Sequence, residues 1–144
     1  MIADPLHLLD CSLVSDGGSA VVLCSAERAA ELRDDPVYLL GAGEGHTHEH
    51  ISAAHSLTTS AAKEAGERAY QMAGLGPKDM SFAQLYDCFT PTVLVELEDL
   101  GFCAKGEGAA FVQATDMRFD GSGPQSRKLP HNTNGGQLSV GQAG

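Results

Sequence analysis

Short apolar runs alternate with amphipathic stretches along this chain. Residues 19–24, 37–40 and 82–86 are apolar runs bounded by turn-forming or polar residues, which is typical of buried strands. Residues 25–33 predict a short helix capped by Ser25, and Pro36 prevents its continuation. Because strand and helix patterns alternate, the sequence predicts an α/β fold.

The clearest helical pattern follows residue 58. Thr58, Thr59 or Ser60 is suited to cap this helix, and Gly74 is suited to end it. One face has spacings of three and four residues and consists mostly of alanine, at Ala61, Ala65, Ala69, Met72 and Ala73. A face of such small side chains predicts close packing against another element.

A second helix is predicted at residues 90–100. Thr90 is expected as its N-cap with Pro91 in its first turn, and Gly101 is expected to stop it. Its apolar side carries Val93, Leu94, Leu97 and Leu100. Residues 121–130 predict a polar loop.

Glycine and histidine dominate residues 41–55. The spacing Gly41, Gly43, Gly45 does not match the dinucleotide-binding pattern GxGxxG, because its third glycine would fall at His46. A loop after a strand is the better interpretation. Alternating histidines at 46, 48 and 50 make a metal site geometrically possible. We expect no metal here, and favour substrate contact by His50 or His55.

The charge balance narrows the choice of ligands. The formal net charge is -10, which disfavours nucleic acid and anionic membranes as partners. The four cysteines include no CxxC pair, so we interpret them as free thiols of a reducing, cytoplasmic compartment. No apolar run approaches the roughly 20 residues that span a bilayer.

Two polar clusters are candidates for chemistry. Tyr86, Asp87, Cys88 and Phe89 lie where a predicted strand ends and a helix begins, and side chains there face a crevice from a rigid support. Packing of a buried thiol beside an aromatic ring, with Asp87 as a structural acceptor, explains the same residues equally well. Further on, Asn134, Gly135 and Gly136 form either a tight turn or a place where a ligand reaches backbone N–H groups.

Taken together, these blocks resemble the thiolase superfamily, in particular its sterol-carrier-protein-X-type thiolases and bacterial lipid-transfer thiolase-like proteins. Residues 9–12 and 15–22 resemble the DGAAA segment that ends the N-terminal half of a thiolase. Residues 86–89 stand where thiolases have Asn-Glu-Ala-Phe and sterol-carrier types have His-Asp-Cys-Phe. Residues 132–144 resemble the Asn-x-Asn-Gly-Gly…Gly-His-Pro block.

The resemblance implies a thiolase-like fold, with a mixed β-sheet layered between helices. Residues 1–35 would end the N-terminal half, and residues 36–144 would form a truncated C-terminal domain. It also implies a CoA thioester as substrate with no covalently bound cofactor, and a homodimer. The family's two active cysteines would lie outside these residues, so Cys11, Cys24, Cys88 and Cys103 are not assigned their roles.

Two departures bear on the expected reaction. Gln142 replaces the histidine of Gly-His-Pro that takes a proton from the nucleophilic cysteine in thiolases, and Tyr86 replaces the oxyanion-directed Asn or His. An amide is no base near neutral pH, whereas a phenol still donates a proton. The resemblance thus implies an acetyl-CoA acetyltransferase-like activity or, alternatively, a retro-aldolase with a small OB-fold/zinc-ribbon partner. A catalytically silent subunit is the third possibility.

The site residues expected from this reasoning have two roles. Tyr86, Asp87 and Gln142 are the catalytic candidates. The residues expected to contact the substrate or CoA are Cys88, Phe89, Asn134, Gly135, Gly136, His50 and His55.

Overall fold

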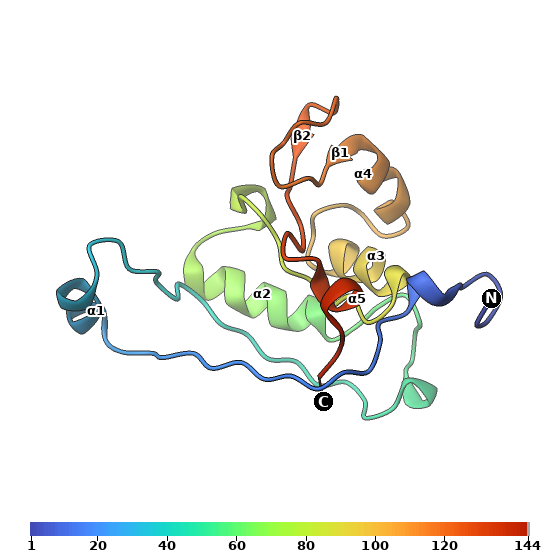
Figure 1. The fold of residues 1–144 in the computed structure, drawn as a ribbon, viewed down its shortest axis with the longest axis horizontal. Coiled ribbons are helices and arrows are strands. Elements are labelled where there is room, and N and C mark those ends of the chain that lie inside the picture. The colour runs from blue at the N-terminus through green and yellow to red at the C-terminus, as the bar shows by residue number, and fades with distance from the viewer. Residues whose placement is uncertain (144) are drawn as a thin grey trace.

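The computed structural model describes residues 1–143, so Gly144, the last residue of the C-terminal block, lies outside it. Within residues 1–143, five α-helices and a small sheet make up the fold (Figure 1). The helices are α1 (Ala26–Leu32), α2 (Ala62–Ala73), α3 (Thr90–Asp99), α4 (Gly108–Ala114) and α5 (Gly136–Val140). The strands are β1 (Thr115–Asp116) and β2 (Arg127–Lys128), and the 3-10 turns are η1 (Leu8–Asp10), η2 (Ile51–Ala53) and η3 (Pro77–Asp79).

Helix α2 forms where the alanine-rich pattern predicts it. The N-cap of α2 is Ala61, one position after the last of the predicted caps, Ser60, whose Oγ accepts a hydrogen bond from the N–H of Ala62 at 3.2 Å. The helix ends at Gly74 in a left-handed conformation with φ +67°. Ser60 also donates to Oδ2 of Asp99 from both its N–H, at 2.6 Å, and its hydroxyl, at 2.9 Å. These bonds join the start of α2 to the end of α3.

The predicted close packing of α2 is confirmed, and its partner is the glycine segment. A Cβ built on Gly43 would overlap the Ala65 carbonyl, and one on Gly41 would overlap the Ala69 carbonyl. Gly45 approaches Ala61 in the same way. Two residues of extended chain advance about 6.8 Å and four residues of helix about 6 Å, so glycines at every second position match alanines at every fourth. The glycine pattern is therefore a packing device.

Helix α3 supplies the centre of a small core. Leu97 is fully buried, and Ala83, Val93, Phe111 and Leu129 complete the buried cluster. The first helical residue is Thr90 and the N-cap is Phe89, which corrects the predicted cap by one position. Thr90 does not cap the helix because its hydroxyl donates to Oδ1 of Asp10 at 2.9 Å. This bond ties the N-terminal segment to α3.

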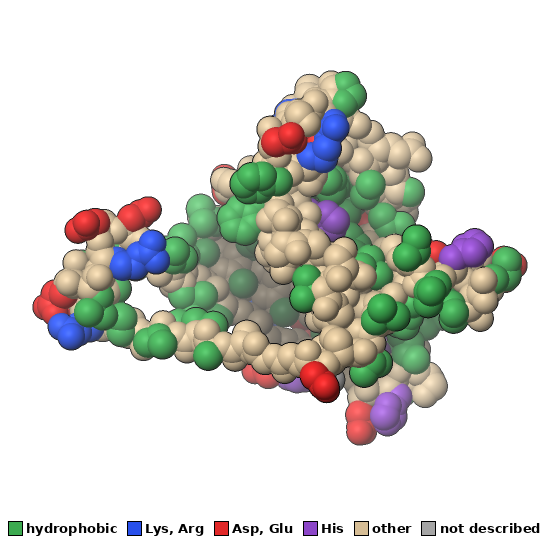
Figure 2. All heavy atoms as spheres, viewed as in Figure 1, with side chains coloured by type: hydrophobic (Ala, Val, Ile, Leu, Met, Phe, Trp, Pro, Cys, Tyr) green, Lys and Arg blue, Asp and Glu red, His purple; other side chains and the backbone are tan. Residues whose placement is uncertain are grey.

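None of the three predicted strands is a strand in this chain. Residues 19–24 and 37–40 run extended on either side of α1, with hydrophobic side chains along them (Figures 1 and 2). Val22 is 93% exposed and Val37 is 92% exposed, so these apolar runs are not buried as their composition predicts. Residues 82–86 make only an isolated parallel bridge, between Ala83 and His131.

The sheet that does form was not predicted. β1 and β2 are parallel and pair Thr115 with Arg127 and Asp116 with Lys128. β2 lies within residues 121–130, which the sequence indicated to be a polar loop. The Asp116 carboxylate, which is 2% exposed, binds Lys128 Nζ at 2.9 Å and Arg118 Nε at 3.0 Å. These cations hold the pKa of Asp116 far below its usual range, and the ion pairs close the loop between the two strands.

Candidate functional site

Tyr86 and Gln142 meet directly, although 56 positions separate them in the sequence. Gln142 Nε2 donates a hydrogen bond of 2.9 Å to the Tyr86 hydroxyl oxygen. At the other end of the same amide, Oε1 accepts from the hydroxyl of Ser12 at 3.0 Å. Two of the predicted catalytic residues are therefore in contact, and Ser12 joins them from the N-terminal segment.

Backbone pairing holds Gln142 in this place. Its N–H donates to the Leu13 carbonyl at 2.7 Å, and its carbonyl accepts from the N–H of Ser15 at 2.9 Å. This forms a parallel bridge with Val14, where the N-terminal and C-terminal segments run together (Figure 1). The side chain therefore projects from a fixed backbone.

Asp87 is buried beneath the start of α5. Its Oδ1 accepts from the N–H of Gln137 at 2.7 Å and its Oδ2 from that of Leu138 at 3.4 Å. A carboxylate at a helix N-terminus satisfies N–H groups that have no partner in the helix and is favoured by the helix dipole. Only 4% of Asp87 is exposed, so it supports the position of α5 and does not face solvent.

The paired glycines make this cap possible. A Cβ on Gly136 would overlap the Asp87 carboxylate, and the φ of Gly136 is +61°. The N–H of Gly136 itself donates to Asn134 Oδ1 at 3.1 Å, and that of Gly135 to the Asn132 carbonyl at 2.8 Å. Asp87 thus occupies the close approach to backbone N–H groups that we expected a ligand to use.

Asn132 is a structural residue of the site that sequence reasoning missed. Its side-chain amide accepts from the N–H of Leu85 at 2.7 Å and donates to the Leu85 carbonyl at 3.0 Å. The Asn132 side chain thereby makes the two hydrogen bonds to Leu85, next to Tyr86, that a neighbouring strand would otherwise make. Asn132 has a φ of 44°, which asparagine tolerates better than most residues, and this preference was the available signal.

Tyr86 stands between acidic and thiol groups. Its N–H donates to Glu96 Oε2 at 2.9 Å. Burial raises the pKa of the half-buried Glu96, and repulsion from Asp87 and Asp99 adds to this rise. Burial and the neighbouring Cys88 thiol raise the pKa of the Tyr86 phenol, while the hydrogen bond from Gln142 acts to lower it. The hydroxyl is therefore protonated at neutral pH.

Cys88 and Phe89 fasten this segment to the N-terminus. The Cys88 carbonyl accepts from the N–H of Ser12 at 2.9 Å, and Phe89 forms an antiparallel bridge with Cys11. The Cys88 sulfur lies 3.6 Å from Thr92 Oγ1. Phe89 is 45% exposed, which leaves its ring free to contact a ligand.

His131 is another residue that sequence reasoning did not select. It lines an apolar cleft of about 550 Å³ between the N-terminal segment, α3 and the start of α5. Nε2 of its imidazole is buried without a hydrogen-bond partner. Burial lowers the pKa of His131, and the nearby Asp87 carboxylate opposes this.

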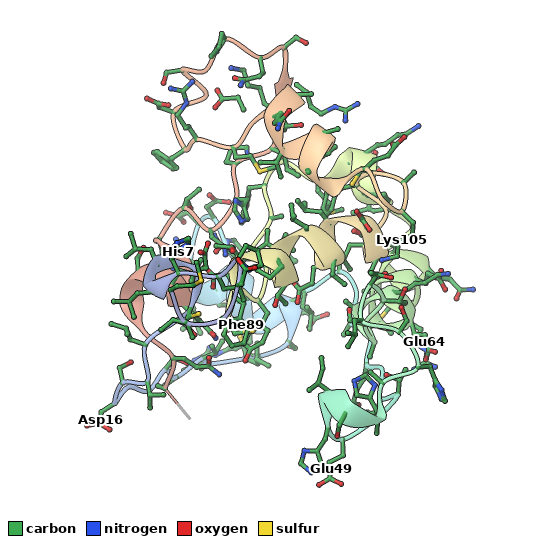
Figure 3. The ribbon with its side chains drawn as sticks, turned by 90° about the vertical axis from the view of Figure 1, so that its right-hand side faces the viewer. His7, Asp16, Glu49, Glu64, Phe89 and Lys105 are labelled. Carbon is green, nitrogen blue, oxygen red and sulfur yellow. The ribbon has the colours of Figure 1, made fainter. Side chains whose placement is uncertain are left out.

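The structure does not bring His50 and His55 to this site. Both are exposed, and Nε2 of His50 lies 3.8 Å from Oε1 of Glu49 at the surface. Their loop, marked by η2 and Glu49, lies apart from α5 in Figure 1 and from Phe89 in Figure 3. Among residues 1–143, no three His, Cys, Asp or Glu side chains converge as a metal site requires.

Comparison with known proteins identifies the family. A model of the thiolase C-terminal domain-like family matches residues 43–144. The chain belongs to this family. The resemblance inferred from the Tyr86 and Asn132 blocks is thereby confirmed, and the α/β fold class is confirmed with it.

Individual relatives are similar over most of this chain. The steroid side-chain-cleaving aldolase of Thermomonospora curvata is 41% identical over 146 residues, covering 95% of this chain and 35% of that protein. The acetyl-CoA acetyltransferase of Methanocaldococcus jannaschii is 40% identical over 125 residues, covering 85% and 32%. A solved structure, the Ltp2–ChsH2(DUF35) aldolase, matches with a TM-score of 0.81 and 42% identity over 96% of this chain and 36% of that one.

The chain therefore spans about a third of the length of these relatives. No helix within residues 1–143 has the length and apolar character needed to cross a membrane.

Proposed function

We propose that the protein containing this chain makes or breaks a carbon–carbon bond in a CoA thioester by aldol chemistry. The observation that carries the proposal is the pairing of Gln142 with Tyr86. The amide occupies a position where thiolase chemistry calls for a basic side chain, and it has no basic form near neutral pH. The phenol beside it has a proton to donate.

These side chains suit a retro-aldol cleavage. In that reaction a base takes the proton of the β-hydroxyl and the bond between Cα and Cβ breaks. The electron pair moves onto the thioester carbonyl as an enolate, which is then protonated at Cα. No acyl-cysteine forms. Tyr86 is 46% exposed and serves as the donor that stabilises the developing charge on the thioester oxygen.

The other site residues have supporting roles in this proposal. Asp87 positions α5, and Asn132 positions the Tyr86 segment. Cys88 lies beside the phenol, and both Cys88 and the exposed ring of Phe89 contact the acyl part of the substrate. Asn134, Gly135 and Gly136 shape the turn that brings the C-terminal segment back to Tyr86.

Acetyl transfer is a second candidate function, favoured by the 40% identity to an acetyl-CoA acetyltransferase. It requires a nucleophilic cysteine and a base from residues other than Cys88 and Gln142. Both reactions use a CoA thioester, which the names of the relatives support.

We infer an assembly from the relatives as well. The solved relative carries ChsH2(DUF35) in its name, which supports a complex of this protein with a small OB-fold/zinc-ribbon partner. A homodimer at the centre of such a complex is part of the proposal. Light scattering of the protein with and without the co-expressed partner tests both assemblies.

A pair of assays on the whole protein separates the functions. One assay supplies a β-hydroxyacyl-CoA whose β-carbon is a tertiary alcohol and follows release of the ketone and the shortened acyl-CoA in equal amounts. The other supplies acetoacetyl-CoA with free CoA and follows loss of the enolate absorbance. We expect cleavage in the first assay. Thiolysis alone would establish acetyl transfer, and no turnover in either, with the partner present, would indicate a silent subunit and contradict the proposal.

A further inference from the structure

We propose that Ser12 is a positioning residue that, acting through Gln142, fixes Tyr86 as a proton donor. The catalytic role of this arrangement rests on the proposed function. The arrangement itself involves no substrate: Ser12 Oγ lies 3.0 Å from Gln142 Oε1, and Gln142 Nε2 lies 2.9 Å from Tyr86 Oη.

The two ends of an amide are chemically different, so its orientation decides what Tyr86 does. With Nε2 toward the phenol, Gln142 donates and the Tyr86 oxygen accepts. The phenol then keeps its own proton for another acceptor. With the amide reversed, the Tyr86 hydroxyl would donate its hydrogen bond to Oε1 of Gln142 and would not be available to another acceptor. In the structure, the hydroxyl of Ser12 donates to Oε1, which occupies the acceptor end of the amide and stabilises the orientation with Nε2 toward the phenol.

Backbone contacts fix both ends of this relay. The N–H of Ser12 donates to the Cys88 carbonyl at 2.9 Å, two residues beyond Tyr86. The next residue, Leu13, accepts from the N–H of Gln142 at 2.7 Å. Ser12 is therefore held against the Tyr86 segment and the Gln142 segment at once. Its position depends on main-chain pairing, so removal of its hydroxyl leaves the surrounding backbone in place.

The expected consequence is a better acid at Tyr86. A hydrogen bond donated to the phenol oxygen stabilises the phenolate and so lowers the pKa. Burial raises the pKa of Tyr86 most, and the titratable groups that face the phenol, Cys88 and Glu96, raise it further. Loss of the Ser12 hydroxyl frees the amide to rotate, and the pKa of Tyr86 rises because these effects are no longer opposed.

Tyrosine titration by NMR tests this without substrate. The whole protein, labelled with ¹³C at tyrosine Cζ, is titrated, and the signal of Tyr86 is assigned by its loss in Tyr86→Phe. We expect Ser12→Ala to raise the pKa of Tyr86 by about half a unit to one unit. Gln142→Ala is expected to raise it as much, and the double variant no further. Ser12→Thr, which keeps a hydroxyl, is expected to restore the original value.

Two outcomes overturn the inference. One is an unchanged Tyr86 titration in Ser12→Ala, whatever happens to its thermal stability, because a purely structural serine would move only the melting temperature. The other is additive shifts from Ser12→Ala and Gln142→Ala, which would show independent action. Neither outcome bears on the assays of carbon–carbon cleavage, so failure of the relay is distinct from failure of the proposed function.

Discussion

The Tyr86 hydroxyl accepts a 2.9 Å hydrogen bond from Gln142 Nε2, and this contact joins the two departures of the chain from the thiolase pattern. A single exchange would have left an amide beside an oxyanion-directed Asn or His, or a phenol beside an imidazole. The two replacements form one donor system instead. The chemistry of the site is therefore best examined by changing each partner separately.

Tyr86→Phe removes the hydroxyl and keeps the ring. We expect kcat for carbon–carbon cleavage to fall by roughly 10²–10⁴, the usual contribution of a positioned proton donor. The melting temperature should change little, since Tyr86 is 46% exposed and its ring packing survives. Steady-state kinetics and a thermal melt check both parts. Tyr38→Phe is the matched control, because Tyr38 is also about half exposed and lies on the arm beside α1.

If Tyr86→Phe retains near wild-type kcat, the hydroxyl has no catalytic role and Tyr86 contributes only the packing of its ring. A parallel loss of folding would instead show that the hydroxyl is structural. Either result removes Tyr86 as the main catalytic candidate.

Gln142→His restores the residue type found in thiolases. If thiolase chemistry were merely dormant, the new imidazole would raise thiolysis of acetoacetyl-CoA. We expect no such rise, and a fall in aldol cleavage, because the Ser12 hydroxyl and the Tyr86 oxygen are arranged around an amide with one acceptor end and one donor end. Gln142→Asn is the control, since it keeps the amide but shortens its reach. A thiolysis rate well above wild type would favour acetyl transfer.

The cap on α5 predicts a loss of stability in Asp87→Ala. This change leaves the N–H groups of Gln137 and Leu138 without their acceptor in a buried place. We expect a cost of about 1–3 kcal/mol in the free energy of unfolding, measured by urea denaturation. Asp87→Asn keeps one acceptor oxygen and should lose less. Equal stability of all three proteins would show that Asp87 does not support α5.

The packing of the glycine segment on α2 gives a sharp steric test. Gly43→Ala places a methyl group on the Ala65 carbonyl, and we expect it to destabilise the chain by about 1–3 kcal/mol through overpacking. Gly18→Ala is the control, because a Cβ there meets no atom within 4 Å. Denaturation midpoints compare the two. Similar midpoints would mean that the segment moves away from α2 at little cost.

Much of this structure was predictable where local pattern decides it. Helix α2, its end at Gly74 and its small face followed from spacing alone. The apolar runs at 19–24 and 37–40 were predicted as strands because short runs of apolar side chains are typical of buried strands. A strand also needs a neighbour for its hydrogen bonds, and none pairs with these runs within residues 1–143.

The site was predictable in its residues but not in its contacts. Motif comparison identified Tyr86, Asp87 and Gln142. It could not show that Asp87 caps α5, because that depends on how the turn at Gly135 and Gly136 folds back. Ser12 lies in a block that resembles the family but was not selected from it, and His131 carried no motif. Their importance comes from contacts over long sequence separations, such as the 130 positions between Ser12 and Gln142.

His131 predicts how stability depends on pH. Burial lowers the pKa of its imidazole in the folded chain from the ordinary value of 6.5. The unfolded chain therefore binds a proton at a higher pH than the folded chain does. The stabilising contribution is complete above about pH 6.5 and is lost as the pH falls from there through the folded pKa. We expect the melting temperature to decline over this interval.

His131→Leu, which fits the apolar cleft and has no proton to bind, should flatten the decline, whereas His55→Leu at an exposed position should leave it unchanged. Melting curves between pH 7.5 and pH 5, at about half-unit steps, resolve the three profiles. A decline in melting temperature that persists in His131→Leu would contradict the prediction and assign the acid sensitivity to other titratable groups.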